Sequence, residues 1–244
     1  MENIFKDLNN KQIEAVRATE GPVLILAGAG SGKTRALTHR IAYMIANGIP
    51  PQNILSVTFT NKAAGEIKDR VQKLVTGNWS PVTGKIENSL NQPATSNQQL
   101  TTSPWLGTFH SICLRILRHE VLAIVPYSSN FVVYDEDDQL GLIKKVMADL
   151  DINTKKFNPK NILGRISALK NELVGYEKFA DSATEYYEKI VAPIYTGYQE
   201  ALEQNNALDF DDLIMLCVRI FQKYPKTLEK YQNLFRYILI DEYQ

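Results

Sequence analysis

The segment PVLILAGAGSGKT, residues 22–34, decides the predicted fold of this chain. The apolar run at residues 22–29 predicts a buried strand, and apolar residues at helical spacing predict a helix from Gly32 to about Asn47. The sequence between them, AGAGSGKT, has the glycine spacing and the Lys-Thr ending of a phosphate-binding loop. Such a loop needs a strand before it and a helix after it, so the segment predicts an α/β nucleotide-binding domain.

The residue types in this loop suit a polyphosphate. Backbone amides from Gly30 to Thr34 can point at an anion, and the N-terminus of the following helix adds its positive dipole end. The Lys33 ammonium would reach the β and γ phosphates, and the Thr34 hydroxyl would bind Mg²⁺. The residues expected to bind the nucleotide phosphates are Ala27, Gly28, Ala29, Gly30, Ser31, Gly32, Lys33, Thr34 and Arg35.

Two reservations apply to the loop. A glycine-rich turn that merely joins a strand to a helix is the alternative, and the Gly-Lys-Thr register makes it the less favoured one. The strict pattern also has glycine where Ala27 stands. Alanine suffices there if the position needs no positive φ.

Further strands and helices alternate with the first pair. The segments at 53–60, 105–110 and 237–242 predict strands, and residues 61–75 predict a helix with one apolar stripe. Strands that alternate with helices indicate βαβ units and a parallel sheet. The last strand, YILIDE, ends in Asp241 and Glu242 and, beside a phosphate loop, is typical of a Walker B motif. Asp241 would hold Mg²⁺, directly or through water, and Glu242 would orient or deprotonate the attacking water.

Two stretches depart from this alternation. Residues 76–104 are rich in Asn, Gln, Ser, Thr and Pro with almost no apolar period, which predicts a flexible polar insertion without a packed core. From about Tyr134 to Asn206 helical patterns dominate, which predicts an all-helical insert in the α/β domain.

Composition excludes some classes of protein. The chain has 244 residues, 27 basic and 27 acidic, so a histone-like or tail-driven nucleic-acid binder is disfavoured, although a local basic groove is not. Its two cysteines, Cys113 and Cys217, form no CxxC pair, so a structural zinc or a disulfide framework is not expected. The first ten residues are not typical of a signal peptide, and no apolar run is long enough to span a bilayer, which fits the cytoplasm.

At this point six segments, in order, resemble one family: LNNKQ, AGAGSGKT, TFTNKAA, GTFHS, ALDFDDL and IDEYQ. The chain resembles the N-terminal portion of the UvrD/Rep/PcrA-type superfamily-one DNA helicases. The resemblance covers essentially the whole chain except residues 76–104. It implies that residues 1–112 form the first part of a RecA-like domain 1A, 113–206 a helical subdomain 1B, and 207–244 a return to 1A ending at Walker B.

The resemblance also implies roles in nucleotide binding. Gln12 matches the glutamine that reads the adenine edge, although the spacing Asn9-x-x-Gln12 is equally that of a helix capping box. Gln244 matches the residue that senses the γ-phosphate and links it to DNA. With Lys33, Asp241 and Glu242 it completes the expected catalytic set, and ATP and Mg²⁺ are the expected cofactors.

Two further motifs match segments that contact single-stranded DNA in the family. A loop at the end of a strand, followed by a helix N-terminus, offers amides and hydroxyls to a phosphate, and an aromatic ring there can stack on a base. For Phe59 a place in the core is an equal alternative, for Thr60 a helix cap is the alternative, and for His110 a structural hydrogen bond is. The expected DNA contacts are Thr58, Phe59, Thr60, Asn61, Lys62, Thr108, His110 and Ser111.

The helical region leaves two points open. Asp209, Asp211 and Asp212 invite a metal site, but a helix cap with two acidic residues in the first turn explains them better. We therefore reject the metal interpretation. In the family subdomain 1B contacts DNA, and Lys170 and Asn171 are candidates for that contact.

The expected function is an ATP-dependent 3′–5′ DNA helicase that moves on single-stranded DNA and acts at junctions of single- and double-stranded DNA. A second RecA-like domain, which supplies arginines to the transferred phosphate, is not in this sequence and would come from the same or a second polypeptide. We therefore expect the chain alone to hydrolyse ATP feebly, not to unwind DNA, and to be marginally stable or to aggregate. The alternative is a non-catalytic nucleotide- or DNA-binding remnant; a metabolic kinase would not explain TFTNKAA and GTFHS.

Overall fold

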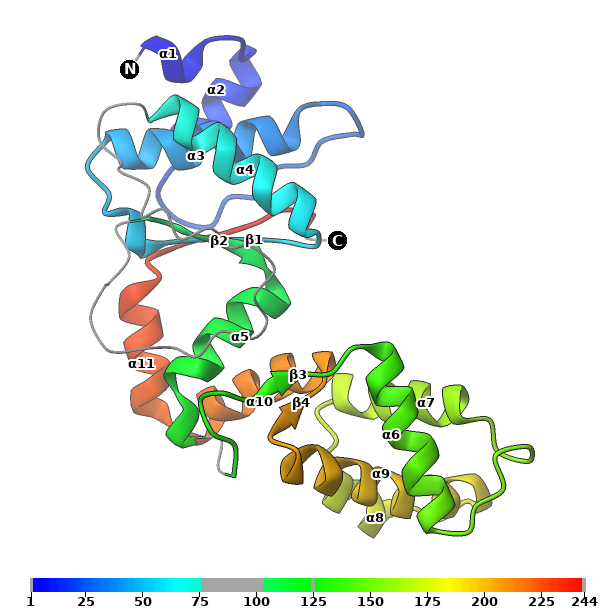
Figure 1. Cartoon of the computed structure of the whole chain (residues 1–244). Helices are drawn as coiled ribbons and strands as arrows, with labels where there is room; N and C mark the ends of the chain where they lie inside the picture. The colour runs from blue at the N-terminus through cyan, green and yellow to red at the C-terminus, as the bar shows by residue number, and fades with distance from the viewer. Residues whose placement is uncertain (1, 76–102, 124–125, 243–244) are drawn as a thin grey trace. The chain divides into compact units, whose positions relative to one another are not determined.

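The computed structural model describes residues 2–75, 103–123 and 126–242. The chain divides into two compact units, an α/β unit and a mostly helical unit (Figure 1). It passes from the first unit to the second between Ile112 and Cys113 and returns between Pro225 and Lys226. The polar insertion predicted at 76–104 lies almost entirely outside the described residues, as does Gln244.

The α/β unit contains a parallel three-stranded sheet, as predicted. Its strands are β1 (Ile54–Thr58), β2 (Trp105–Thr108) and β5 (Tyr237–Ile240), in the order β2-β1-β5. Thr58 pairs with Thr108, and Val57 pairs with Ile240. The three strands therefore end at one edge of the sheet, which brings three loops that follow strands close together.

Helices cover the sheet on both faces, which makes the unit a layered α/β structure (Figure 1). On one face, apolar side chains of α3 (Lys33–Ala46) and α4 (Asn61–Leu74) pack with Ile54 and Leu239 of the strands. On the other, the Trp105 ring meets Phe235, just after α11 (Pro225–Leu234), edge-on with centroids 5.0 Å apart. The remaining helices here are α1 (Glu2–Phe5), α2 (Asn10–Arg17) and a short 3₁₀ turn (Pro51–Asn53).

The strand predicted at residues 22–29 is not formed. The segment has no regular structure, and Leu24 and Leu26 are 67% and 87% exposed. An apolar run adopts a strand when it can pair and half-bury itself against a neighbour, and in the described sheet β5 pairs only with β1. The apolar character of this segment is evident from the sequence, but the sequence does not show whether a partner strand lies beside it.

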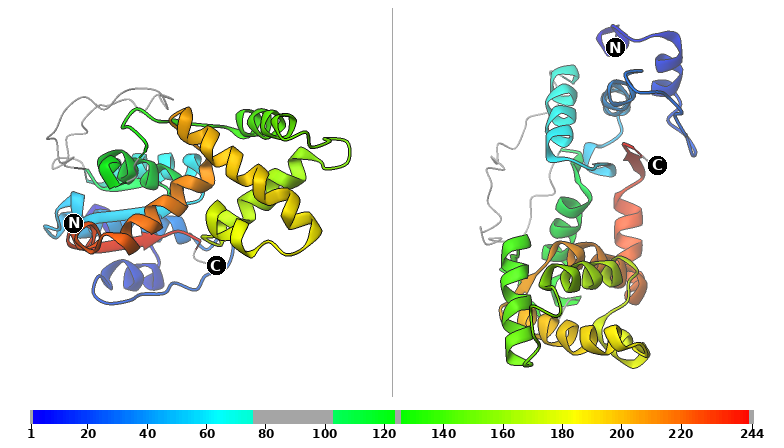
Figure 2. Two further views of the ribbon diagram at one scale, coloured as in Figure 1. Left: turned by 90° about the horizontal axis from the view of Figure 1, so that it is seen from below. Right: turned by 90° about the vertical axis from the view of Figure 1, so that its right-hand side faces the viewer.

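The helical unit, whose helices are seen from two further sides in Figure 2, has a core of its own. Residues of four helices form most of this core. Fully buried residues such as Ile143, Ile162, Tyr195 and Tyr198 form its centre. Its elements are the end of α5 (Phe109–His119), a 3₁₀ turn (Val121–Ala123), α6 (Glu136–Asp149), α7 (Pro159–Asn171), α8 (Tyr176–Ser182), α9 (Tyr186–Gln204) and α10 (Phe210–Lys223), with strands β3 (Val132–Val133) and β4 (Ala207–Leu208).

The end of the helical unit differs from the expected boundary. The sequence suggested a return to the α/β domain at residue 207, whereas residues 207–225 belong with the helical unit. The reason is local pairing: β4 forms a parallel pair with β3, and Lys170 of α7 forms ion pairs with the start of α10. The return to the α/β unit comes with α11 and β5.

Candidate functional site

The phosphate loop has the backbone shape that its glycines allow. Gly30 and Gly32 have φ of 74° and 85°, in the left-handed region that favours glycine. The Ser31 amide and hydroxyl both donate to the Gly28 carbonyl, at 3.3 and 2.7 Å, and close the turn. Ala27 is not among the residues with positive φ, which meets the condition for alanine at that position. Helix α3 then begins at Lys33.

The Lys33 ammonium lies over the loop that precedes it. Its Nζ donates to the carbonyl oxygens of Ala27 at 2.9 Å and of Gly28 at 3.3 Å. A positive charge is thus held against the backbone of the loop that would bind a polyphosphate. Arg35 points elsewhere, because its guanidinium donates to the Asp7 carbonyl at 3.3 Å.

The expected magnesium ligands come together across the unit. The Thr34 hydroxyl at the start of α3 donates to Asp241 Oδ2, just after β5, at 3.4 Å. Mg²⁺ is commonly held by one or two protein oxygens, with waters and substrate phosphates completing the octahedron. A hydroxyl and a carboxylate beside a phosphate loop fit that ion, and no larger cage of carboxylates is required.

The rest of the Walker B segment is described in part. The Asp241 amide donates to the Val57 carbonyl at 3.0 Å, so the ladder with β1 continues past the last residue of the strand. Glu242 follows with φ of 58° and is exposed. That left-handed turn takes the chain out of the strand direction. Gln244 lies outside the described residues.

Gln12 caps a helix, as its alternative interpretation expected. Asn9 Oδ1 accepts from the Gln12 amide, and Gln12 Oε1 accepts from the Asn9 amide, each at 2.9 Å, which is the reciprocal capping box of α2. The same side chain also reaches the phosphate loop, since Nε2 donates to the Ser31 carbonyl at 2.9 Å. The sequence did not predict this second contact. The adenine role of Gln12 stays a prediction.

In the TFTNKAA segment the exposed residues follow the strand. Thr58, the last residue of β1, is buried, whereas Phe59 is 61% exposed, which rules out the core alternative for this ring. The Thr60 side chain caps α4 by accepting from the Ala63 amide at 3.1 Å. Asn61 and Lys62 begin the helix and are exposed. The candidate contacts are thus the residues from Phe59 onward, because burial removes the Thr58 side chain from the surface.

The GTFHS segment lies beside it at the same edge. Thr108 is buried and its hydroxyl accepts from the Ser111 amide at 3.2 Å, so it caps α5 and does not face solvent. Ser111 is exposed and donates to the Thr108 carbonyl, and His110 is half-buried. The Phe109 ring lies 5.9 Å from that of Phe59 at a tilt of 60°. Phe109 therefore joins the candidate surface, although the sequence reasoning passed over it.

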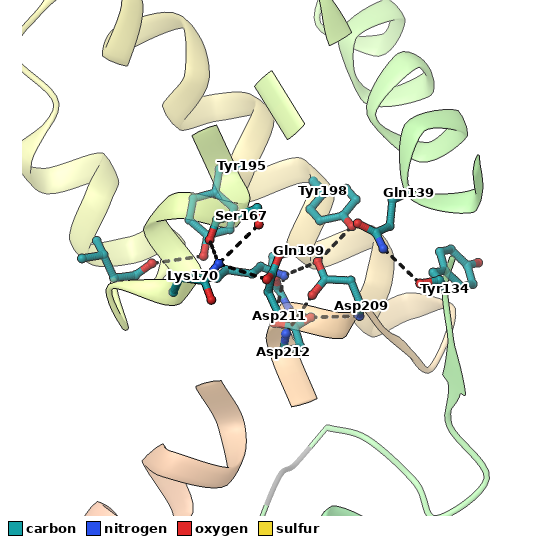
Figure 3. A network of polar contacts seen from close by, with 12 residues as sticks. Tyr134, Gln139, Ser167, Lys170, Tyr195, Tyr198, Gln199, Asp209, Asp211 and Asp212 are labelled. Carbon is teal, nitrogen blue, oxygen red and sulfur yellow. Dashed lines mark hydrogen bonds and ion pairs between the residues drawn. The ribbon is translucent and has the colours of Figure 1, made fainter. Parts of the chain in front are cut away.

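Two of the three aspartates of ALDFDDL, Asp209 and Asp212, form a helix cap and a buried ion cluster (Figure 3). Asp209 and Asp212 make the capping box of α10. Lys170 Nζ lies 2.6 Å from Asp209 Oδ2 and 2.9 Å from Asp212 Oδ1, and all three side chains are almost completely buried. Tyr198 Oη donates to Asp209, and Gln199 Nε2 donates to Asp212. In the three described stretches, no group of three or more His, Cys, Asp or Glu side chains is arranged to hold a metal ion.

This cluster corrects the expectation for Lys170. A side chain that is 1% exposed and paired with two carboxylates cannot meet DNA, so Lys170 holds α7 to α10 instead. Asn171 is exposed, but its amide is held by the Ser167 carbonyl at 2.9 Å and by Asp211 Oδ1 at 3.2 Å. Its place on the surface leaves a role in DNA contact as a prediction.

Burial and charge together set the titration of the cluster. Burial lowers the pKa of Lys170, but attraction to Asp212 and Asp209 more than offsets it, so the pKa lies above the ordinary value. Burial raises the pKa of Asp212 to about 6, and Lys170 only partly opposes this. Burial and the neighbouring carboxylates also raise the pKa of Tyr198. Burial is thus the largest cause of the raised pKa of Asp212, and the charge of the neighbouring Asp209 adds to it.

We expect the stability of the protein to respond to pH through Asp212. The pKa of Asp212 in the folded protein is above the ordinary 3.8. The contribution of this group to the free energy of unfolding is therefore fully present below pH 3.8 and is lost as pH rises through about 6. Asp212→Asn should abolish that component. The wild-type advantage in free energy of unfolding over the variant should fall by up to about 3 kcal/mol from pH 4 to 7. Urea unfolding across this range measures it, with Asp211→Asn as control; parallel curves for wild type and Asp212→Asn would contradict the assignment.

The arrangement of the α/β unit points to one class of protein. The family of the UvrD/REP helicase N-terminal domain matches residues 8–244. The chain therefore belongs to the UvrD/REP helicase N-terminal domain family, as its six motifs suggested.

Individual relatives agree with the family. The chain is 46% identical to the ATP-dependent DNA helicase PcrA of Staphylococcus aureus over 245 aligned residues, and equally so to that of Staphylococcus epidermidis. The alignments cover all of this chain but 30% of each relative. The chain thus spans less than a third of the length of these relatives. Among the described helices, none is long and apolar enough to cross a membrane.

Proposed function

We propose that this chain is the ATP-binding and single-stranded DNA-binding part of an ATP-dependent DNA helicase that moves 3′ to 5′. One observation carries the proposal. Thr34 of the phosphate loop lies 3.4 Å from Asp241 at the edge of the sheet, in the same unit as the exposed Phe59. The names of the relatives support the same activity. A nucleotide site and a stacking surface on the ends of neighbouring strands can influence each other through β1 and β5.

The residues of the loop suggest how the nucleotide is held. Lys33 would exchange its bonds to the Ala27 and Gly28 carbonyls for bonds to the β and γ phosphates of a nucleotide in the loop. Thr34 and Asp241 would hold Mg²⁺, which supplies positive charge to the phosphates. Glu242 would orient or deprotonate the attacking water, and Gln244 would sense the γ-phosphate.

The DNA side rests on Phe59 and its neighbour Phe109. An exposed phenylalanine is costly to keep in water unless a partner covers it, and stacking on a base tolerates any sequence. Polar residues follow each ring of this pair in the sequence and would contact the DNA backbone: Asn61, Lys62, His110 and Ser111. We further propose that junctions of single- and double-stranded DNA are bound, with the helical unit contributing.

Phe59→Ala should lower the affinity for single-stranded DNA by roughly 1–3 kcal/mol, the usual value of one base–aromatic stack. Phe59→Tyr keeps the ring and should bind within about twofold of the wild type. Fluorescence anisotropy with a labelled oligonucleotide measures both variants. Equal losses for Ala and Tyr, or none for Ala, would remove Phe59 from the DNA site.

We propose that a second RecA-like domain, on the same or a second polypeptide, provides arginines that stabilise charge on the transferred phosphate, an effect of roughly 10³–10⁵ in rate. The 30% coverage of the relatives supports this. We also propose that the protein is located in the cytoplasm and takes part in DNA repair or replication.

The purified 27.6 kDa chain is accordingly expected to bind Mg-ATP but to hydrolyse it slowly and to leave a 3′-tailed duplex intact. The comparison sample is the same chain mixed with the remaining part of a PcrA relative. ATP turnover should be higher in this mixture than with the chain alone if the two polypeptides associate. Unwinding by the chain alone would overturn this proposal. ATP and DNA binding with no gain from any partner would instead favour the alternative, a non-catalytic remnant.

A further inference from the structure

The side chain of Gln12 connects two parts of the α/β unit that lie apart in the sequence. Its Oε1 accepts from the Asn9 amide at 2.9 Å, so the carboxamide is oriented by the first turn of α2. Its Nε2 then donates to the Ser31 carbonyl at 2.9 Å. Because the two atoms belong to one planar group, fixing the oxygen also fixes the direction of the donor.

The contact at Ser31 controls a peptide unit of the phosphate loop. In a trans peptide the C=O of one residue and the N–H of the next point in opposite directions. Drawing the Ser31 oxygen toward Gln12 therefore turns the Gly32 N–H away from α2. An amide of this loop can serve an anion only if it points toward it, so this one hydrogen bond sets the direction of a potential phosphate donor.

The Gln12 side chain also lies close to Gly32, the residue that follows Ser31. A Cβ at Gly32 would lie 2.7 Å from Gln12 Nε2, closer than real Cβ contacts allow, and the residue has φ of 85°. The Gln12 amide thus occupies the space that a side chain at position 32 would need. Glycine in the loop and glutamine in α2 fit each other as a pair.

We propose that Gln12 is a positioning residue for the phosphate loop, in addition to any contact with a base. Its carboxamide has a second N–H and a second lone pair, so a base edge can be bound while the Ser31 contact is kept. The inference rests on the proposed function only in that the ligand of the loop is a polyphosphate. It predicts that loss of Gln12 weakens binding of a polyphosphate that has no base at all.

The test compares two neutral variants in the full chain. Gln12→Met has a similar length and loses the bond to Ser31, whereas Asn9→Ala weakens the cap of α2 and leaves Gln12 in place. Calorimetry with Mg²⁺ and inorganic tripolyphosphate should show about three- to tenfold weaker binding for Gln12→Met, the value of one net hydrogen bond. Asn9→Ala should stay within about twofold. A loss confined to ATP, or equal losses in both variants, would overturn the proposal in favour of base recognition or helix capping alone.

A second measurement needs no ligand. Hydrogen exchange of a peptide covering residues 27–36 reports the bonds from the Ser31 amide to Gly28 and from the Ala36 amide to Gly32. Exchange should be several-fold faster in Gln12→Met than in Asn9→Ala or the wild type. Unchanged exchange in Gln12→Met would overturn the positioning role. If the wild type bound neither ATP nor tripolyphosphate, the proposed function would fail, and this exchange comparison would still decide the role of Gln12.

Discussion

Lys170→Met is expected to lower the free energy of unfolding by about 3–5 kcal/mol, the cost of leaving a buried charge without its partner. The variant removes the one cation of the cluster and leaves Asp209 and Asp212 buried side by side. Because Asp209 also caps α10, the repulsion falls on the start of that helix. Urea unfolding followed by circular dichroism at pH 7 measures the loss.

The control and a rescue make this prediction specific. Lys160→Met changes an exposed lysine of the same helix and should alter stability by less than about 0.5 kcal/mol. Adding Asp212→Asn to Lys170→Met should recover part of the loss, since it removes one of the two orphaned carboxylates. Additive losses in the double variant would show that Lys170 stabilises the unit by its packing and not by its charge.

The second large effect is expected at the phosphate loop. Lys33→Met should weaken Mg-ATP binding at least about a hundredfold, since each hydrogen bond to a charged group contributes roughly 1.5–3 kcal/mol. The ammonium already lies at the loop carbonyls of Ala27 and Gly28, so little movement is needed to reach a phosphate. Calorimetric titration with Mg-ATP measures the change.

The control for this variant is Lys11→Met on the neighbouring helix α2. The Lys11 side chain is 89% exposed and forms an ion pair with Glu14, away from the loop contacts of Lys33, so nucleotide affinity should be unchanged. A thermal melt of Lys33→Met should match the wild type within a few degrees, which separates loss of ligand binding from loss of the fold. Near-normal ATP affinity in Lys33→Met would mean that AGAGSGKT is only a turn.

Local patterns in the sequence predicted the parts of the site that depend on neighbouring residues. The capping spacing of Asn9 and Gln12 and the glycine positions of the loop are set within a few residues, and the structure contains both. The meeting of Thr34 with Asp241, 207 residues away, was predictable only because the ends of parallel strands share an edge. In each case a rule of backbone geometry connects pattern to structure.

Features that depend on distant partners could not be predicted in this way. Residues 22–29 have the composition of a buried strand, but pairing requires a neighbour that composition does not reveal. Lys170 looked like any surface lysine, because nothing near it in the sequence shows that Asp209 and Asp212 lie opposite. The Gln12–Ser31 hydrogen bond could not be predicted for the same reason, since it joins segments that no local spacing relates.

The way the chain passes through its two units sets an order for folding on the ribosome. The helical unit is one stretch between residues 113 and 225, so it can fold as soon as that stretch has emerged from the exit tunnel. The sheet cannot be completed at that stage, because β5 follows β1 by 183 positions in the chain, as the pairing of Val57 with Ile240 shows. Asp241, which follows β5, therefore reaches Thr34 at the nucleotide site only after the whole helical stretch has been synthesised.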